Sequence, residues 1–146
     1  MIKELSAGAI IFFRQSNKIY YLLLRYPRLS AKSKKQYWGF AKGGIEEGET
    51  VTETVQREIK EETSLTGIKL LPGFKEEEKY YFFRSGRKIF KKVIFLLAEA
   101  DTKKVRISEE HLDYKWLDYQ NSLKQLTYDN ARNILKKAHS FILANK

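Results

Sequence analysis

The chain has 146 residues, a length typical of one domain with a substantial hydrophobic core. Hydrophobic residues make up 42% of the sequence and charged residues 32%, a balance that excludes wholesale disorder. The sequence contains no cysteine, which excludes disulfide bonds and thiolate metal sites. We therefore expect one domain that spans residues 1–146.

The N-terminal segment has the features of neither a secretory signal nor a membrane-spanning helix. The run MIKELSAGAIIFF contains only a short apolar stretch and two early charges. The absence of cysteine also fits a reducing compartment. We expect a soluble, cytoplasmic protein with no membrane contact and no obligate protein partner.

Charge is distributed unevenly along the chain. The whole sequence carries +10, whereas residues 43–62 hold seven acidic and two basic residues and carry −5, so the remainder carries +15. A basic surface can simply keep a protein soluble, or it can attract nucleic acid or a nucleotide polyphosphate. An acidic spot within basic surroundings suits a cation that bridges to phosphates.

The N-terminal half predicts two strands, two loops and a helix. Residues 6–27 indicate two strands joined by a turn at residues 15–18. A basic loop follows over residues 25–35, and residues 37–49, with four glycines, predict a shaped loop without regular structure. Thr50, followed three residues later by Glu53, matches a capping box and predicts a helix over about residues 51–64.

The C-terminal half predicts a hairpin, a strand and a second helix. Residues 70–100 indicate a long hairpin that turns at residues 85–86, and residues 111–119 hold another short strand. Residues 127–146 predict an amphipathic helix whose apolar side is formed by Ala131, Ile134, Leu135, Ala138 and Ile142. The order of strands, helix, strands and helix indicates a mixed α/β sandwich.

The helix predicted over residues 51–64 places carboxylates on its apolar side. At about 100° per residue, Val55 and Ile59 define the face turned to the core. Glu62 falls about 20° from Val55, inside the apolar stripe, and Glu58 about 60° away, at its edge, with Glu61 beside it. In contrast, the wheel turns Glu53, Arg57 and Lys60 away from the core, where Glu53 and Arg57 are spaced to pair.

Buried carboxylates cost several kcal/mol unless their charge is compensated. They can take up protons, pair with lysine or arginine, or bind a metal ion, and the competing interpretation is an ordinary solvated face. Three carboxylates on one patch offer oxygen ligands, which suit Mg²⁺ or Mn²⁺. Magnesium prefers few carboxylates together with water and substrate phosphates, so the pattern points to phosphate chemistry.

The segment GGIEEGETVTETVQREIKEETSL, residues 43–65, resembles the Nudix box, G-x5-E-x7-R-E-U-x-E-E-x-G-U, in which U is aliphatic. The matching residues are Gly43, Glu49, Arg57, Glu58, Ile59, Glu61, Glu62 and Leu65. Ser64 departs from the pattern, which has glycine there. A serine in the left-handed conformation costs about 1 kcal/mol or moves the end of the helix to Gly67. We expect activity to survive, because no metal ligand is changed.

The similarity covers nearly the whole chain. The stretches YWGFAKGGIEEGE, GFKEEEKYYF, KVIFLLAEA, ISEEHLDYKWL and AHSFI resemble the asymmetrical diadenosine-tetraphosphate hydrolases within the Nudix family. The resemblance implies the Nudix fold, an α/β/α sandwich with a central mixed β-sheet and the loop–helix–loop of the box. It also implies Mg²⁺-dependent hydrolysis, with Mn²⁺ as a substitute, in which water attacks a phosphorus and diadenosine tetraphosphate gives ATP and AMP.

The resemblance also implies roles for individual residues of the box. Glu58 and Glu62 correspond to metal ligands, Glu61 completes or relays the site, and the carbonyl of Gly43 is a further ligand. One of the glutamates helps to deprotonate water, and Glu58 is the favoured candidate, although the sequence does not decide among the three.

Outside these ligands, a supporting ion pair and one more acid are expected. Glu49 and Arg57 occupy the positions of the ion pair in the family, without excluding the pairing of Arg57 with Glu53. Glu110 is the candidate for an additional metal ligand. Its alternatives are Glu109 and Glu99, and an exposed loop acid without a role is an equally good interpretation.

Candidate substrate contacts lie in the predicted hairpin. Strand alternation puts Tyr80 and Phe82 on one face and Tyr81 and Phe83 on the other. Tyr80 corresponds to a base-stacking position of the resembled hydrolases, although it also fits a packing role. Lys91 corresponds to a basic position that contacts phosphate.

Further contacts are expected beside the box. Lys42 precedes the box glycine and is placed to meet a phosphate, and His111 is given a supporting role because lone histidines are more often structural than catalytic. The basic loop contributes Lys35, together with Arg25, Arg28, Lys32 and Lys34.

Three alternatives remain open for the function. One is an RNA 5′-pyrophosphohydrolase, which is favoured by the +15 charge of the sequence outside residues 43–62. Its partner would be the RNA 5′ end in place of a nucleotide polyphosphate. Another is a general pyrophosphatase of nucleoside triphosphates or nucleotide sugars. The third is a non-catalytic nucleotide-binding or RNA-binding domain, which the intact glutamates argue against.

Overall fold

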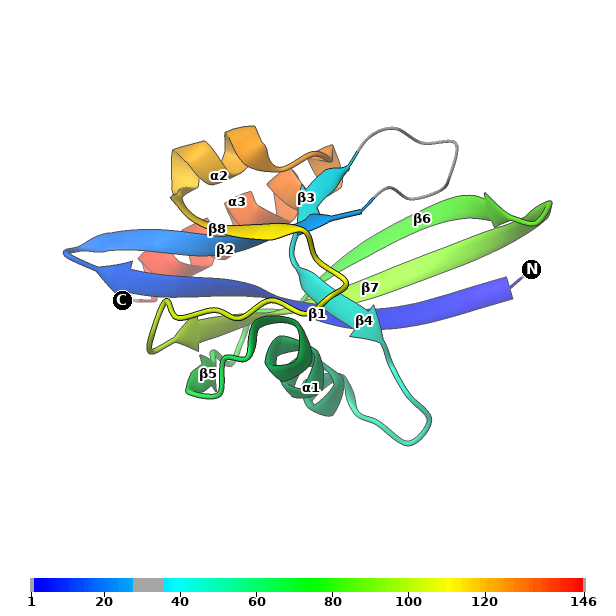
Figure 1. The fold of residues 1–146 in the computed structure, drawn as a ribbon, viewed down its shortest axis with the longest axis horizontal. Coiled ribbons are helices and arrows are strands. Elements are labelled where there is room, and N and C mark those ends of the chain that lie inside the picture. Colours follow the sequence, from blue (N-terminus) through cyan, green and yellow to red (C-terminus); the bar gives the residue numbers. More distant parts are fainter. Residues whose placement is uncertain (1, 28–35, 146) are drawn as a thin grey trace.

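The computed structural model describes residues 2–27 and 36–145 (Figure 1). Its N-terminal half contains β1 (Ile2–Gln15), β2 (Lys18–Tyr26), β3 (Tyr37–Gly39), β4 (Ala41–Gly44) and α1 (Val51–Thr63). The second half contains β5 (Ile68–Leu70), β6 (Glu76–Arg84), β7 (Arg87–Ala100), β8 (Asp113–Asp118), α2 (Tyr119–Gln125) and α3 (Asp129–Ala144).

One mixed sheet joins the eight strands. Its central order is β3-β2-β1-β7-β5, while β4 pairs with β1, β6 with β7 and β8 with β2. The β1–β7 pair is parallel and the other pairs are antiparallel. Helix α1 lies on one side of the sheet and α2 and α3 on the other (Figure 1). This arrangement confirms the predicted mixed α/β sandwich.

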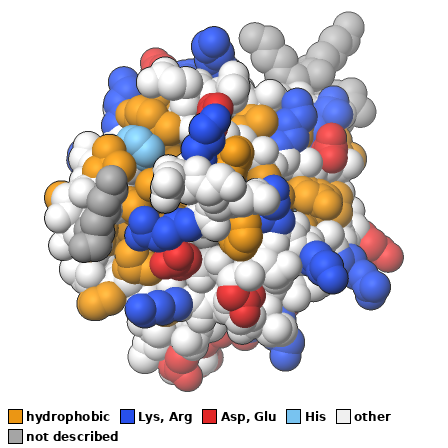
Figure 2. Space-filling view, turned by 90° about the vertical axis from the view of Figure 1, so that its left-hand side faces the viewer, with side chains coloured by type: hydrophobic (Ala, Val, Ile, Leu, Met, Phe, Trp, Pro, Cys, Tyr) orange, Lys and Arg blue, Asp and Glu red, His pale blue; other side chains and the backbone are white. Residues whose placement is uncertain are grey.

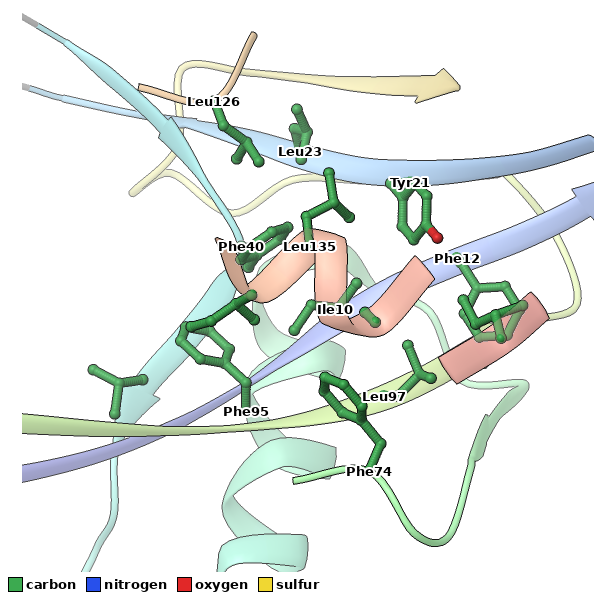
Figure 3. Packing of buried hydrophobic residues seen from close by; sticks show 14 residues of the cluster. Ile10, Phe12, Tyr21, Leu23, Phe40, Phe74, Phe95, Leu97, Leu126 and Leu135 are labelled. Carbon is green, nitrogen blue, oxygen red and sulfur yellow. The ribbon is translucent and has the colours of Figure 1, made fainter. Parts of the chain in front are cut away.

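Strand β1 is buried on both faces because helices cover both sides of the sheet. Its alternate residues enter two different cores. Ala9 and Ile11 join a cluster with Val55 of α1, whereas Ile10 and Phe12 join the opposite cluster, which includes α3 (Figure 3). The continuous apolar run of β1 therefore supports both layers.

Both predicted turns are present. Ser16 and Asn17 have φ of 51° and 64°, and Ser85 and Gly86 have φ of 51° and 76°. Positive φ at both central residues is typical of two-residue hairpin turns that follow the twist of the strands. β1 begins at Ile2, four residues before the predicted strand.

The prediction of a loop without regular structure over residues 37–49 is wrong in its first half, which contains β3 and β4. These strands are three and four residues long, and they are held by long-range pairing, as between Gly8 and Lys42. A Cβ on Gly8 would lie 2.2 Å from the carbonyl oxygen of Ala41, so this approach requires glycine. Strand β5 and helix α2 are further elements that the sequence did not predict.

Positive charge is scattered over at least one face of the molecule. On the face shown in Figure 2, which includes the end with the β1–β2 turn, Lys and Arg side chains are spread among carboxylates. Within residues 2–27 and 36–145, no helix is long and apolar enough to cross a membrane.

Candidate active site

The start of α1 is fixed by the predicted capping box. The hydroxyl of Thr50 accepts from the backbone N–H of Glu53 at 3.1 Å, and the carboxylate of Glu53 accepts from the N–H of Thr50 at 3.0 Å. These two bonds satisfy backbone donors that the helix leaves free. They fix where the helix begins, while the buried Val55 and Ile59 define the side that faces the sheet.

The inward orientation of two carboxylates is confirmed. Glu58 and Glu62 are 9% and 3% exposed and lie on α1 beside the buried Val55 and Ile59. Glu61, the third glutamate, keeps 59% of its side chain exposed. The wheel therefore identified the two glutamates for which burial requires compensation.

Arg57 connects the box loop to α1. Its guanidinium donates to the carboxylate of Glu49 through Nε at 2.7 Å and Nη2 at 2.9 Å, and to the carbonyl of Gly44 at 2.9 Å. Nη1 donates to Glu58 at 2.7 Å and to Glu61 at 3.3 Å. The expected ion pair of Glu49 and Arg57 is thus present.

Arg57 lies outside the apolar core, as the wheel predicts, but only 23% of its side chain is exposed. The helical wheel could not show this because the box loop folds back over the helix and covers that side. No ion pair between Arg57 and Glu53 occurs in the described part of the chain, where Glu53 instead completes the capping box.

Gly43 lies directly against the carboxyl group of Glu58. A Cβ on Gly43 would stand 2.1 Å from the carboxyl carbon, so a side chain there would displace the carboxylate of Glu58. Gly43 belongs to β4 and pairs with Ala7 of β1. The glycine of the box pattern thus has a steric reason: it allows the strand to approach the carboxylate.

His111 is buried and contacts Glu62. Its Nε2 is 2.7 Å from Oε1 of Glu62, and its ring stands edge-on to Tyr26 at a centroid distance of 4.5 Å. Nδ1 of His111 has no hydrogen-bond partner among the described residues. The contact holds Glu62 in a fixed orientation, which agrees with the expected supporting position of His111.

A pocket of about 280 Å³ gathers the acidic side chains. It is lined by Glu58, Glu61, Glu62, Ser108, Glu109 and Glu110. The segment after β7 is held beside α1 by backbone bonds from Arg106 to Thr63 and from Ser108 to Glu62. The pocket therefore brings the candidate Glu110 and its alternative Glu109 to the box glutamates, whereas Glu99 lies elsewhere and bonds to Arg14 at 3.2 Å.

Ser64 ends α1 in the left-handed conformation, with φ 62° and ψ 11°. Of the two expected outcomes, strain at Ser64 and a shift to Gly67, the structure shows the first. The Ser64 hydroxyl donates to the carbonyl of Arg106 at 3.0 Å, which a glycine would not do. The serine therefore helps to hold the segment that carries Ser108 and Glu110.

The pKa values of the carboxylates differ according to their surroundings. Burial, together with the charge of Glu62, raises the pKa of Glu58 to about 7. Hydrogen bonds from Arg57 and from the backbone of Glu46 lower the pKa of Glu49 to about 2. Glu49 is thus fixed as an anion that pairs with Arg57, while burial and the charge of Glu62 outweigh the hydrogen bond that Glu58 accepts from Arg57.

The donor set of the pocket fits a hard divalent cation. Oε2 of Glu62 and Oγ of Ser108 are buried and have no hydrogen-bond partner among the described residues. All candidate donors are oxygens, the type that Mg²⁺ and Mn²⁺ prefer. Within the described ranges no three acidic or histidine side chains already form a metal cage. A cation would therefore compete with Arg57 for Glu58 and Glu61.

A second pocket, of about 450 Å³, is mostly aromatic. It is lined by Tyr37, Lys42, Glu78, Tyr80, Phe82, Tyr128, Asp129 and Asn130. The rings of Tyr37 and Tyr128 are 5.7 Å apart, and those of Tyr80 and Phe82 are 6.1 Å apart. We call this site the aromatic pocket.

The sequence identified Tyr80 and Lys42 but missed Tyr37 and Tyr128. Tyr37 and Tyr128 are far apart in the sequence and are joined through β3, where the N–H of Trp38 donates to the hydroxyl of Thr127 at 2.8 Å. No short-range pattern carries this information. Lys91 lies opposite Tyr80 in the β6–β7 register, on the same face.

Lys42 links the two pockets. It lines the aromatic pocket, and its neighbour Gly43 touches Glu58 of the acidic pocket. Burial is the main cause that lowers the pKa of Lys42, partly offset by Glu78 and Glu62. The expected contacts Lys35, Arg28, Lys32 and Lys34 lie outside the described residues.

Comparison with known proteins places this geometry in a family. Residues 3–138 match the family described as NUDIX domain, and the chain belongs to this family. The chain is a Nudix hydrolase, an enzyme class that uses divalent metal cations.

Individual relatives match over almost the full chain. The asymmetrical bis(5′-nucleosyl)-tetraphosphatase of Rattus norvegicus is 31% identical over 142 residues, which cover 94% of each chain. The enzyme of the same name from Caenorhabditis elegans is 28% identical over 94% of this chain and 95% of its own. A solved C. elegans Ap4A hydrolase binary complex aligns with a TM-score of 0.81 and 25% identity, covering 97% of this chain and 98% of the other. These matches confirm the resemblance found in the sequence.

Proposed function

We propose that this protein hydrolyses dinucleoside polyphosphates with Mg²⁺ and cleaves diadenosine tetraphosphate off-centre into ATP and AMP. The proposal is supported by the relatives, which are named as asymmetrical bis(5′-nucleosyl)-tetraphosphatases and share 28–31% identity with the chain. The absence of cysteine supports a cytoplasmic location for this single domain.

The observation that carries the proposal is that two unlike pockets flank neighbouring residues of β4: Lys42 lines the aromatic pocket, and Gly43 lies beside Glu58 of the acidic pocket. The aromatic pocket offers rings on which a nucleobase can stack. The acidic pocket offers carboxylates for a cation that holds phosphate. A substrate with a base at one end of a phosphate chain fits both at once, and Lys42 stands where the phosphates would pass from one pocket to the other.

Within the acidic pocket we assign roles by position. Glu58 and Glu62, with Glu61 and the carbonyl of Gly43, are proposed to hold the cation, and Glu110 to complete its ligands. A divalent cation supplies such a site with neutralisation of phosphate charge and a lower pKa for the attacking water.

One carboxylate must accept the proton of that water. Glu58 is our candidate because burial raises its pKa to about 7, close to the range in which a general base works well. The pair of Glu49 and Arg57 holds the loop against α1, and His111 orients Glu62. Tyr80 is proposed to stack on adenine, with Lys42 and Lys91 near the phosphates.

The test is incubation with diadenosine tetraphosphate and Mg²⁺, followed by chromatography of the products. The proposal predicts equal amounts of ATP and AMP. Formation of two molecules of ADP would contradict off-centre cleavage. The absence of any product would contradict the proposal that diadenosine tetraphosphate is a substrate. Parallel incubation with 5′-triphosphate RNA and nucleoside triphosphates distinguishes the alternative substrates, which should be turned over more slowly.

A further inference from the structure

The β6–β7 hairpin has a second aromatic face, turned away from the aromatic pocket. We call it the outer hairpin face and define it as Lys79, Tyr81, Phe83, Lys88, Phe90 and Lys92. We propose that the outer hairpin face binds single-stranded nucleic acid. This inference goes beyond the proposed hydrolysis and does not depend on it, because none of these residues lines either pocket.

The register of the hairpin places these side chains together. Tyr81 lies opposite Phe90, Phe83 opposite Lys88, and Lys79 opposite Lys92. Residues opposite each other in an antiparallel pair share one face, and residues two apart on a strand share it too. Tyr80 and Phe82 therefore point to the aromatic pocket, while their neighbours form a separate surface.

The rings on this surface are open to solvent. Tyr81 is 54% exposed and Phe83 is 71% exposed, and Leu5 of the adjoining β1 is 46% exposed. In Figure 1 the end of the hairpin extends past α1 and away from α2 and α3, so none of the three described helices covers it. Large aromatic side chains that lie exposed beside each other are typical of a surface that binds a ligand or a macromolecular partner.

The charge of the surface identifies the kind of partner. Three lysines, Lys79, Lys88 and Lys92, stand against one carboxylate, that of Glu77. Glu77 is 3.0 Å from Lys92 and 3.7 Å from Lys79. The ammonium of Lys88 lies 4.6 Å from the ring centre of Tyr81, so a cation and an aromatic ring are presented together. The excess of positive charge matches a polyanion.

Single-stranded nucleic acid fits this combination better than a second copy of the chain. Two copies that met through this face would bring their lysines together, and like charges at an interface are costly. Unpaired bases stack on aromatic rings while basic side chains contact the phosphates. Sheet surfaces with aromatic rings bind two or three bases in this way.

The experiment uses fluorescence anisotropy with an oligouridylate of about 12 nucleotides that has a 5′-hydroxyl group, a length within the usual range of such sites. The lack of a 5′-phosphate chain removes the feature that the acidic pocket would recognise. The protein carries Glu58→Gln, so that turnover of any kind does not affect the reading. We expect binding that weakens steeply as salt is raised.

Two variants test the face itself. The double variant Tyr81→Ala/Phe83→Ala should lower the affinity by roughly tenfold or more, because each stacked base contributes to binding. Lys88→Glu should also weaken binding and should flatten the salt dependence. The matched controls are Leu143→Ala and Lys136→Glu on α3, which remove an exposed apolar side chain and an exposed lysine elsewhere and should leave the affinity unchanged.

Three results would overturn the inference. The first is the absence of binding at low salt, and the second is an equal loss of affinity in the α3 controls. The third is concentration-dependent dimerisation in sedimentation that the double variant abolishes, which would assign the face to a second copy. Thermal unfolding of each variant shows whether it is folded, and the single variant Phe83→Ser, at the most exposed ring, replaces the double variant if that one is unstable.

Discussion

Helices α1 and α3 pack on opposite faces of the same sheet, yet they bury different chemistry. Helix α3 buries Ile134, Leu135, Ala138 and Ile142, all of them apolar. Helix α1 buries Val55 and Ile59 together with Thr54, Glu58, Glu62 and Thr63. Both are amphipathic, so the difference lies in what the protein requires of the buried face. α3 buries only apolar side chains, whereas α1 keeps two buried carboxylates at a cost in stability that a cation would offset.

Removal of one buried carboxylate should have the largest effect on activity. Glu58→Gln keeps the size of the side chain but removes a proposed metal ligand and base, so the turnover of diadenosine tetraphosphate should fall by about 100-fold or more. Steady-state kinetics measure the change. Glu47→Gln, an exposed acid of the box loop, is the matched control and should change turnover less than about twofold. Equal rates for Glu58→Gln and the wild type would remove Glu58 from the mechanism.

A change on α3 should instead be seen in stability. The side chain of Leu135 is fully buried, and Leu135→Ala leaves a cavity in its place. The free energy of unfolding should therefore fall by about 2–5 kcal/mol. Glu62→Gln on α1 keeps the contact with His111 and removes a buried charge, so without metal its effect should stay within about 1 kcal/mol. Urea unfolding in the presence of a chelator measures both. A larger loss for Glu62→Gln than for Leu135→Ala would contradict the contrast between the helices.

Protons and divalent cations should compete for the carboxylate of Glu58 on α1. The pKa of Glu58 is raised from 4.5 to about 7 in the folded protein, so without metal this group favours folding below pH 4.5, and that contribution is lost as the pH rises through 7. Mg²⁺ should therefore raise the melting temperature more at about pH 8 than at about pH 5, where Glu58 is protonated. Thermal unfolding with and without Mg²⁺ measures the difference. It should disappear in Glu58→Gln, and an equal shift at both pH values would argue against Glu58 as a ligand.

The smallest effect is expected at the end of α1. Ser64→Gly relieves a left-handed serine but loses the hydrogen bond to Arg106, and the two contributions are each about 1 kcal/mol. The stability should thus change by less than about 1 kcal/mol, and turnover by less than twofold. A manyfold gain in activity at unchanged stability would show that Ser64 limits the enzyme.

The sequence predicted the parts of the site that depend on one helix and its loop. The capping box at Thr50 predicted where α1 begins, and the apolar residues Val55 and Ile59 defined the face that correctly assigned Glu58 and Glu62 to the buried side. The sequence failed where a distant segment decides the geometry. Tyr37 meets Tyr128 only through the sheet, and Ser108 reaches the box glutamates from the segment after β7.

The same limit explains the errors in the fold. Strands β3 and β4 are too short for an alternating pattern, and their pairing partners lie in β2 and β1. The long strands and both predicted helices were visible because each carries its own periodicity. Short-range sequence patterns are therefore sufficient to predict the long strands and helices of this protein. The short strands and the residues that line the pockets can be identified only from the tertiary structure.

The most direct test of the account is a Mn²⁺ titration followed by electron paramagnetic resonance, which distinguishes free from bound ion without turnover. The account predicts that the wild type binds Mn²⁺ and that Glu62→Gln weakens the binding by about tenfold or more, whereas Glu47→Gln binds as the wild type does. Equal Mn²⁺ binding by the wild type and by folded Glu62→Gln would contradict the claim that α1 buries its carboxylates to hold a cation.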